Sequence, residues 1–126
     1  MCFFDAEKKG YNMAKNDYYV IVYQILAYLY QRLKKGEQVK ASMLEHDSPI
    51  FESINKKYWA YIMYQMYKMQ LIEGLDFVEL DGLQIPYAIN LENCMITPLG
   101  IEYLCDNSLI EKAKRFLKDI NEIIPF

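Results

Sequence analysis

Apolar residues recur at helical spacing along most of the chain, and one strand-like stretch interrupts them. Between Asp17 and Lys35 they extend around most of a helix, which has basic residues near its end and Gly36 as its stop. The apolar positions are Tyr18, Ile21, Val22, Ile25, Leu26, Leu29 and Leu33, widened by Tyr19, Tyr23, Ala27 and Tyr30. A helix with so wide an apolar arc is buried on two sides. The pattern therefore predicts either a central core helix or a dimer seam.

A second long helix is predicted from Lys56 to about Gln70, with Asn55 as its N-cap. Its predicted core side consists of Trp59, Ile62, Met63, Met66 and Met69. The opposite side consists of Lys57, Ala60, Tyr61, Tyr64, Tyr67 and Lys68. Between the two long helices the pattern allows only a short helix, Ala41 to His46, because Asp47-Ser48-Pro49 forms a turn. An exposed face of tyrosine and lysine is unusual and needs an explanation.

Leu71 to Thr97 favours strands and contains helix-breaking glycine and proline, so we expect a β-hairpin that turns near Asp81-Gly82. Thr97 followed by Pro98 is a typical helix start, and this helix should run to about Cys105. The sequence Ser108-Leu109-Ile110-Glu111 then reads as a capping box for the last helix. That helix has an apolar face formed by Leu109, Ala113, Phe116, Leu117, Ile120, Ile123 and Ile124.

The order helix, short helix, longer helix, β-hairpin, helix is that of a winged helix, in which the hairpin is the wing. The predicted fold class is therefore α+β and mostly helical, a winged helix-turn-helix with a two-stranded wing and a C-terminal amphipathic helix. A chain of 126 residues is long enough for one domain. We assign residues 17–126 to it, and residues 1–16 to an N-terminal arm or extension.

Three segments carry a resemblance to a known family. They are Leu71-Ile72-Glu73-Gly74, Ile85-Pro86-Tyr87, and Ile96-Thr97-Pro98-Leu99-Gly100-Ile101-Glu102-Tyr103-Leu104 with Asp106-Asn107-Ser108. Together they resemble the YjcQ-like proteins, a small winged-helix family of Gram-positive bacteria and their phages. The resemblance covers roughly Asp17 to the C-terminus. It implies a fold but no catalytic or binding residue, and Met1 to Asn12 are a departure from it.

The remaining features of the sequence argue against a membrane protein, a secreted protein, a metalloprotein and an enzyme. No apolar run is long enough to cross a bilayer, and the N-terminus lacks a secretory signal, so we expect a cytoplasmic protein. Cys2, Cys94 and Cys105 match neither a disulfide framework nor a zinc site, and the single histidine, His46, reads as structural. We expect no metal and no cofactor. The acids of the hairpin alternate with apolar residues, as on the exposed side of a strand, so we predict that the protein is not an enzyme.

The first functional hypothesis is binding of double-stranded DNA, in transcriptional control, through the second long helix. In a helix-turn-helix this helix enters the major groove. The candidate contacts are Lys56, Lys57, Tyr61, Tyr64, Tyr67 and Lys68. The helix carries three lysines and no acid, the most basic stretch of the chain.

The wing argues against DNA, because Leu71 to Thr97 contains Glu73, Asp76, Glu79, Asp81 and Glu92 but no basic residue. The net charge of −3 supplies no general attraction to phosphate. The alternative is a non-enzymatic protein-interaction module, bacterial or phage-associated, that presents the tyrosine face to a partner. Nine of the twelve tyrosines lie on the two long helices, although many should simply pack between helices, Tyr18 and Tyr58 first. A homodimer through the first helix is expected in either case.

Overall fold

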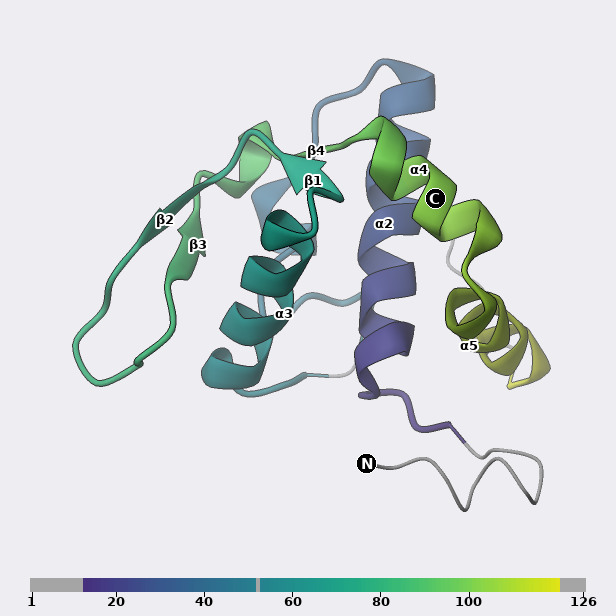
Figure 1. The fold of residues 1–126 in the computed structure, drawn as a ribbon, viewed down its shortest axis with the longest axis horizontal. Helices are drawn as coiled ribbons and strands as arrows, with labels where there is room; N and C mark the ends of the chain where they lie inside the picture. The colour runs from purple at the N-terminus through teal and green to yellow at the C-terminus, as the bar shows by residue number, and fades with distance from the viewer. Residues whose placement is uncertain (1–12, 52, 121–126) are drawn as a thin grey trace.

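Helix α2 (Tyr18–Lys35) forms the centre of the molecule with the other helices arranged around it, and a β-hairpin projects beyond them at the left of Figure 1. The computed structural model describes residues 13–51 and 53–120. The helices in this part are α2 (Tyr18–Lys35), α3 (Lys56–Lys68), α4 (Pro98–Asp106) and α5 (Ser108–Asp119). The strands are β1 (Ile72–Glu73), β2 (Asp76–Val78), β3 (Tyr87–Ile89) and β4 (Met95–Ile96). The prediction of an α+β, mostly helical fold is confirmed.

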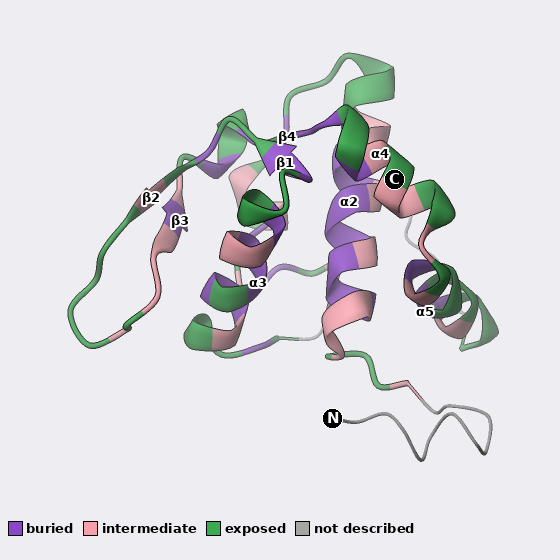
Figure 2. Ribbon diagram, viewed as in Figure 1, coloured by how far each residue is buried: buried purple, intermediate pink, exposed green. Residues whose placement is uncertain are grey.

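Helix α2 is a central core helix because α3, α4, α5 and β4 all contact it. Buried residues follow one another around much of its circumference, as Figure 2 shows along most of its length. They are Val20, Ile21, Val22, Gln24, Ile25, Leu26, Tyr28 and Leu29. Leu33 was expected in the core face and is 41% exposed, because it lies in the last turn, close to the C-cap Gly36. Most of the wide apolar arc is thus covered within the chain itself.

The short helix expected from Ala41 to His46 is only the 3-10 turn η1 (Ala41–Met43). Two side chains hydrogen-bond to the backbone at the end of this turn. The Ser48 hydroxyl donates to the carbonyl of Met43 at 2.7 Å, and the Trp59 indole donates to the carbonyl of Leu44 at 2.7 Å. The Ala41 carbonyl accepts from the amide of Leu44, as in a 3-10 turn, and the two side-chain hydrogen bonds fix the turn that follows it.

Helix α3 begins where the sequence predicts, since the Asn55 side chain accepts a hydrogen bond from the amide of Tyr58 at 2.8 Å. Trp59, Ile62, Met63 and Met66 are buried as expected. The predicted burial of two residues was wrong. Met69 is 44% exposed because the helix ends at Lys68, two residues earlier than expected, so helical spacing no longer applies. Ala60 is fully buried in the core, because α3 is contacted by α2, β1 and β3 and is therefore covered on more than one side.

The wing consists of two short antiparallel pairs, β1 with β4 and β2 with β3. Phe77 pairs with Ala88 in the outer pair, and the loop between β2 and β3 contains Gly82, so the predicted hairpin is confirmed. Between the two pairs, η2 (Leu91–Asn93) occupies one side and Gly74 the other. Only glycine fits there: its φ is +94°, and a Cβ would lie 2.0 Å from the Asn93 carbonyl oxygen.

Thr97 joins the wing to α4 through two hydrogen bonds. Its hydroxyl accepts from the amide of Gly100 at 2.9 Å and donates to the carbonyl of Gln70 at 2.6 Å, so it caps α4 and fastens it to the end of α3. Gly100 allows this close approach, because a Cβ there would lie 2.3 Å from the Leu71 carbonyl oxygen. The predicted helix start at Thr97 and Pro98 is confirmed.

Helix α5 packs on α2 and α4 through Ile110, Ala113 and Leu117. Its N-cap is Asn107 and not the predicted Ser108, because the Asn107 carboxamide accepts from the amides of Leu109 and Ile110. The predicted apolar face is therefore partly wrong: Ile110 replaces Leu109 as a fully buried residue, and Ile120 is exposed. Ile123 and Ile124 lie outside the described residues.

The element order and the wing are those of a winged-helix-like fold, with α3 in the place of the recognition helix. Of the predicted arm, residues 1–12 lie outside the described part, and the assignment of residues 1–16 to an arm stays a prediction. The Tyr58 hydroxyl donates to the carbonyl of Asn16 at 2.7 Å and holds the chain there against α3.

Candidate nucleic-acid interface

Four of the six predicted contact residues form a single line on the outer face of α3. Lys57, Tyr61, Tyr64 and Lys68 follow one another at spacings of four, three and four residues, which places them on one side of a helix. Lys57, Tyr61 and Lys68 are exposed, and Tyr64 is half-buried. We call these four residues the α3 strip. A lysine stands at each end, with the two tyrosines between them.

The other two predicted residues are placed differently. Lys56 is exposed in the first turn of α3, but one residue before Lys57 it lies about 100° away around the helix. Tyr67 is 44% exposed and turned toward the wing, where its ring centroid lies 4.8 Å from that of Phe77. Helical spacing in the sequence therefore places the same four residues on one face as the structure does, and the role of all six residues in binding stays a prediction.

The wing contacts the α3 strip near both of its ends. The Lys57 ammonium group donates to the carboxamide oxygen of Gln84 at 3.2 Å. Toward the other end, the ring of Phe77 lies 5.4 Å from that of Tyr64, and the Lys68 ammonium lies over the Tyr64 ring at 5.0 Å. These contacts with the wing orient two residues of the strip, Lys57 and Tyr64.

Gln84 and Phe77 were missed by the sequence interpretation, which treated the wing only as a source of negative charge. Phe77 was assigned to a strand, and its alternation with exposed neighbours is a weak signal that it faces the core. Gln84 gave no signal, because a single uncharged polar residue near a hairpin turn is ordinary. Only the folding of the wing against α3 brings its side chain to Lys57.

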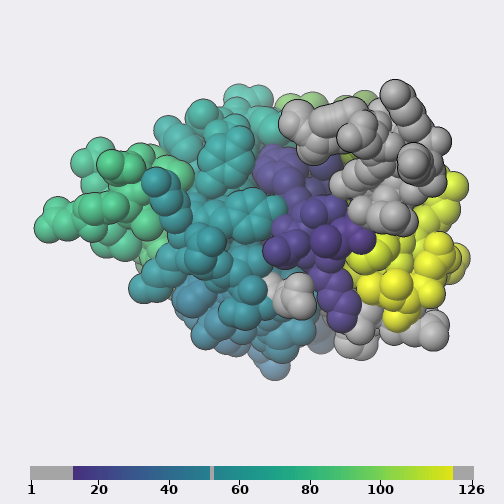
Figure 3. Space-filling model, turned by 90° about the horizontal axis from the view of Figure 1, so that it is seen from below, coloured from purple at the N-terminus to yellow at the C-terminus, as the bar shows by residue number. Residues whose placement is uncertain are grey.

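The five wing acids are all exposed, namely Glu73, Asp76, Glu79, Asp81 and Glu92. They are spread along the wing. Asp76 lies on the face of β2 opposite Phe77, and its carboxylate accepts a hydrogen bond from the Asn90 side chain at 2.7 Å. Glu79 and Asp81 follow β2 in the loop of the outer hairpin. This loop is at the end of the wing, which projects from one end of the molecule, opposite α5 (Figure 3).

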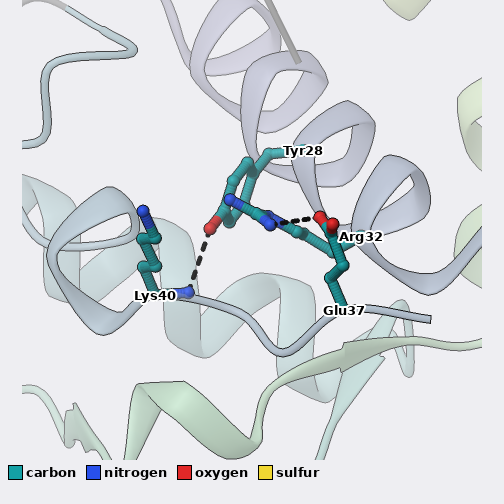
Figure 4. A network of polar contacts seen from close by, with 4 residues as sticks. All are labelled: Tyr28, Arg32, Glu37 and Lys40. Carbon is teal, nitrogen blue, oxygen red and sulfur yellow. Dashed lines mark hydrogen bonds and ion pairs between the residues drawn. The ribbon is translucent and has the colours of Figure 1, made fainter. Parts of the chain in front are cut away.

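Most tyrosines outside the strip serve packing, as expected for Tyr18 and Tyr58, which are half-buried. Tyr28 on α2 is fully buried, and its hydroxyl accepts from the Lys40 amide at 3.0 Å beside the Arg32–Glu37 ion pair (Figure 4). Burial raises the pKa of Tyr18, and it raises the pKa of Tyr58 to about 12. These phenols are structural groups that stay neutral.

Metal-ligating side chains do not cluster among the described residues. They contain no group of three or more His, Cys, Asp or Glu side chains able to hold a metal ion. Cys94 is buried, and burial raises the pKa of its thiol to about 12, while Cys105 is exposed. Cys2 lies outside the described part. His46 lies with Nδ1 3.3 Å from the Ile54 carbonyl oxygen, a contact within the turn that leads to α3.

A family model described as YjcQ protein matches residues 23–123 of the chain. This chain belongs to the YjcQ family. The match includes α3, the whole wing and α4, and it supports the resemblance found in the segments around Thr97. Searches of curated proteins and of solved structures found no match. Within the part that the structure describes, none of the helices combines the length and the apolarity needed to span a membrane.

Proposed function

We propose that this YjcQ-family protein is a non-enzymatic, cytoplasmic DNA-binding protein that acts in transcriptional control. The observation that carries the proposal is the α3 strip. From Lys57 to Lys68 it spans about 16 Å along the helix, at 1.5 Å per residue. A helix of this size fits the major groove of duplex DNA. In such a complex the terminal lysines would neutralise phosphates, and Tyr61 and Tyr64 would lie over base edges and sugars.

The charge of the protein sets how this binding should behave. With a net charge of −3 and an acidic wing, attraction depends on a few lysines, and Glu79 and Asp81 oppose it. Affinity should therefore be modest and should fall steeply with salt concentration. A dimer would double the number of basic contacts on one DNA. The homodimer remains a prediction that light scattering tests, and a concentration-independent monomer mass would remove it.

The decisive experiment is a fluorescence titration of labelled mixed-sequence duplex DNA with the full chain at low salt. We expect the double variant Lys57→Glu/Lys68→Glu to abolish binding. The matched control is Lys112→Glu/Lys114→Glu, which makes the same change of charge at two exposed positions of α5, at the other end of the molecule.

The control should bind almost as the natural chain does. Replacing Lys57 and Lys68 by alanine should reduce the slope of log K against log salt by about two, since each phosphate contact contributes about 0.9. Absence of binding by the natural chain, or equal loss in both charge-reversal variants, would end the proposal.

A protein-interaction module is the second candidate, and a groove at the far end of the strip favours it. The groove has a volume of about 620 Å³ and lies between the end of α3, β1 and the start of α4. Exposed apolar side chains, Tyr67 and Leu99, line it beside Lys68. Exposed apolar surface of this kind is typical of protein-binding sites. Absence of binding in the DNA titration would favour a protein-interaction module over a DNA-binding protein.

A further inference from the structure

Gln84 is held in a backbone conformation that disfavours it. Its φ is +68°, in the left-handed region that glycine adopts readily and other residues adopt at a cost. Among the described residues that are not glycine, only Gln70 and Asn90 share a positive φ. Each of those two residues makes a hydrogen bond within the fold. The Thr97 hydroxyl donates to the carbonyl of Gln70, and the Asn90 side chain donates to the carboxylate of Asp76.

The side chain of Gln84 has a different connection. It is exposed near the turn of the wing, and its carboxamide oxygen accepts from Lys57 at the first end of the α3 strip. Within the described residues its amide nitrogen has no hydrogen-bond partner. The carboxamide thus presents two N–H donors, and the second lone pair of its oxygen stays available, because one oxygen accepts two hydrogen bonds. Lys57 orients this group.

We infer that Gln84 is a specificity-determining residue that reads an adenine in the major groove next to the contacts of the α3 strip. This inference rests on the proposed DNA binding. A glutamine side chain pairs with adenine through two hydrogen bonds, donating to N7 and accepting from N6. The Lys57 contact fixes which way the carboxamide faces, so less rotamer freedom is lost on binding. The uncharged wing residue supplies sequence information, which the lysines alone cannot supply.

The variant Gln84→Gly separates this role from a structural one. Glycine tolerates φ +68°, so the turn should keep its shape and the melting temperature should stay the same or rise. The single tryptophan, Trp59, reports on the wing, because its ring lies 5.0 Å from that of Tyr87 on β3. Its emission should be unchanged in the variant. Gln38→Ala, an exposed glutamine between α2 and η1, is the matched control.

The experiment is selection from a randomised duplex library, followed by titration of the selected duplex and of one in which the preferred adenine is replaced. For the natural chain and for Gln38→Ala we expect about tenfold discrimination at that base pair, as for one bidentate contact. Gln84→Gly should lose this discrimination and should still bind mixed-sequence DNA, through the lysines of the α3 strip. Equal selectivity of Gln84→Gly and the natural chain, or selected sites without a preferred adenine, would overturn the inference and leave DNA binding intact. Absence of any DNA binding would overturn both.

Discussion

Helices α2 and α3 are both long and both rich in tyrosine, yet α2 buries one of its tyrosines completely, whereas α3 exposes two. Tyr28 on α2 is fully buried with its hydroxyl bonded to the Lys40 amide, whereas Tyr61 on α3 is 45% exposed. The difference lies in the neighbours. Elements surround α2 on most sides, while the outer face of α3 is left uncovered between the wing and the start of α2. Tyrosine content therefore says nothing about surface chemistry until the packing is known.

The largest effect should come from truncating the buried tyrosine. Tyr28→Ala removes a full aromatic side chain from the core and leaves the Lys40 amide without its acceptor, so it should reduce the free energy of unfolding by about 4 kcal/mol. Tyr61→Ala should change it by less than about 0.5 kcal/mol. Urea unfolding followed by circular dichroism measures both. Similar losses in the free energy of unfolding of the two variants would show that Tyr28 and Tyr61 do not differ in their contribution to stability.

Two methionines at the end of α3 sharpen the comparison within one helix. Met66 is fully buried, and Met69, only three residues later, is exposed because it follows the last helical residue. Met66→Ala should destabilise the protein by about 3 kcal/mol, as a large-to-small change in a core does. Met69→Ala should be nearly neutral. A large loss for Met69→Ala in thermal unfolding would place the end of the helix further along the chain.

The N-cap of α3 should have a smaller effect. Asn55→Ala removes the acceptor for the Tyr58 amide and should lower stability by about 1 kcal/mol, while Asn55→Asp should restore most of it. The start of the α3 strip should fray, so Asn55→Ala should also weaken DNA binding at Lys57. Hydrogen exchange at the amides of the first turn of α3 is the direct measurement. Unchanged exchange there would show that packing alone fixes this end.

The smallest effect should be an alkaline loss of stability from the packed phenols. Burial raises the pKa of Tyr58 and of Tyr103 to about 12 in the folded chain, against 10.0 for an ordinary tyrosine. The folded state thus holds protons that the unfolded state releases, so the contribution is fully present below pH 10 and is lost between pH 10 and 12. Both side chains are partly solvated, which limits its size.

Denaturant unfolding followed at several pH values between 9 and 12 tests this. Tyr103→Phe should flatten the decline, because phenylalanine keeps the ring and has no proton to lose. Tyr61→Phe, at an exposed position of the strip, serves as the comparison. An equal decline in Tyr103→Phe and the natural chain would assign the alkaline sensitivity to other groups.

The sequence alone determined the local elements of this protein. Asn55, Thr97 with Pro98, and Gly36 mark helix ends through hydrogen bonds and backbone preferences that depend on a few neighbouring residues, and the structure has each boundary there. The exposed lysine and tyrosine face of α3 was also visible, because helical spacing is a local property. The errors lie where side chains distant in sequence decide. The Trp59 indole donates to the Leu44 carbonyl just beyond η1, and α3 is contacted by α2, β1 and β3, so that Ala60 is buried on the side predicted to be exposed.

Only the tertiary structure decided what the wing does. In the sequence the wing stands out only for its acidic residues, and their negative charge argues against binding to DNA phosphates. Folded, it lies against α3, fits Phe77 between Tyr64 and Tyr67, and brings Gln84 to Lys57 across 27 positions of sequence. No local sequence pattern predicts the contact between Gln84 and Lys57, because it depends on the register of two strands and on the angle at which the hairpin leaves α3.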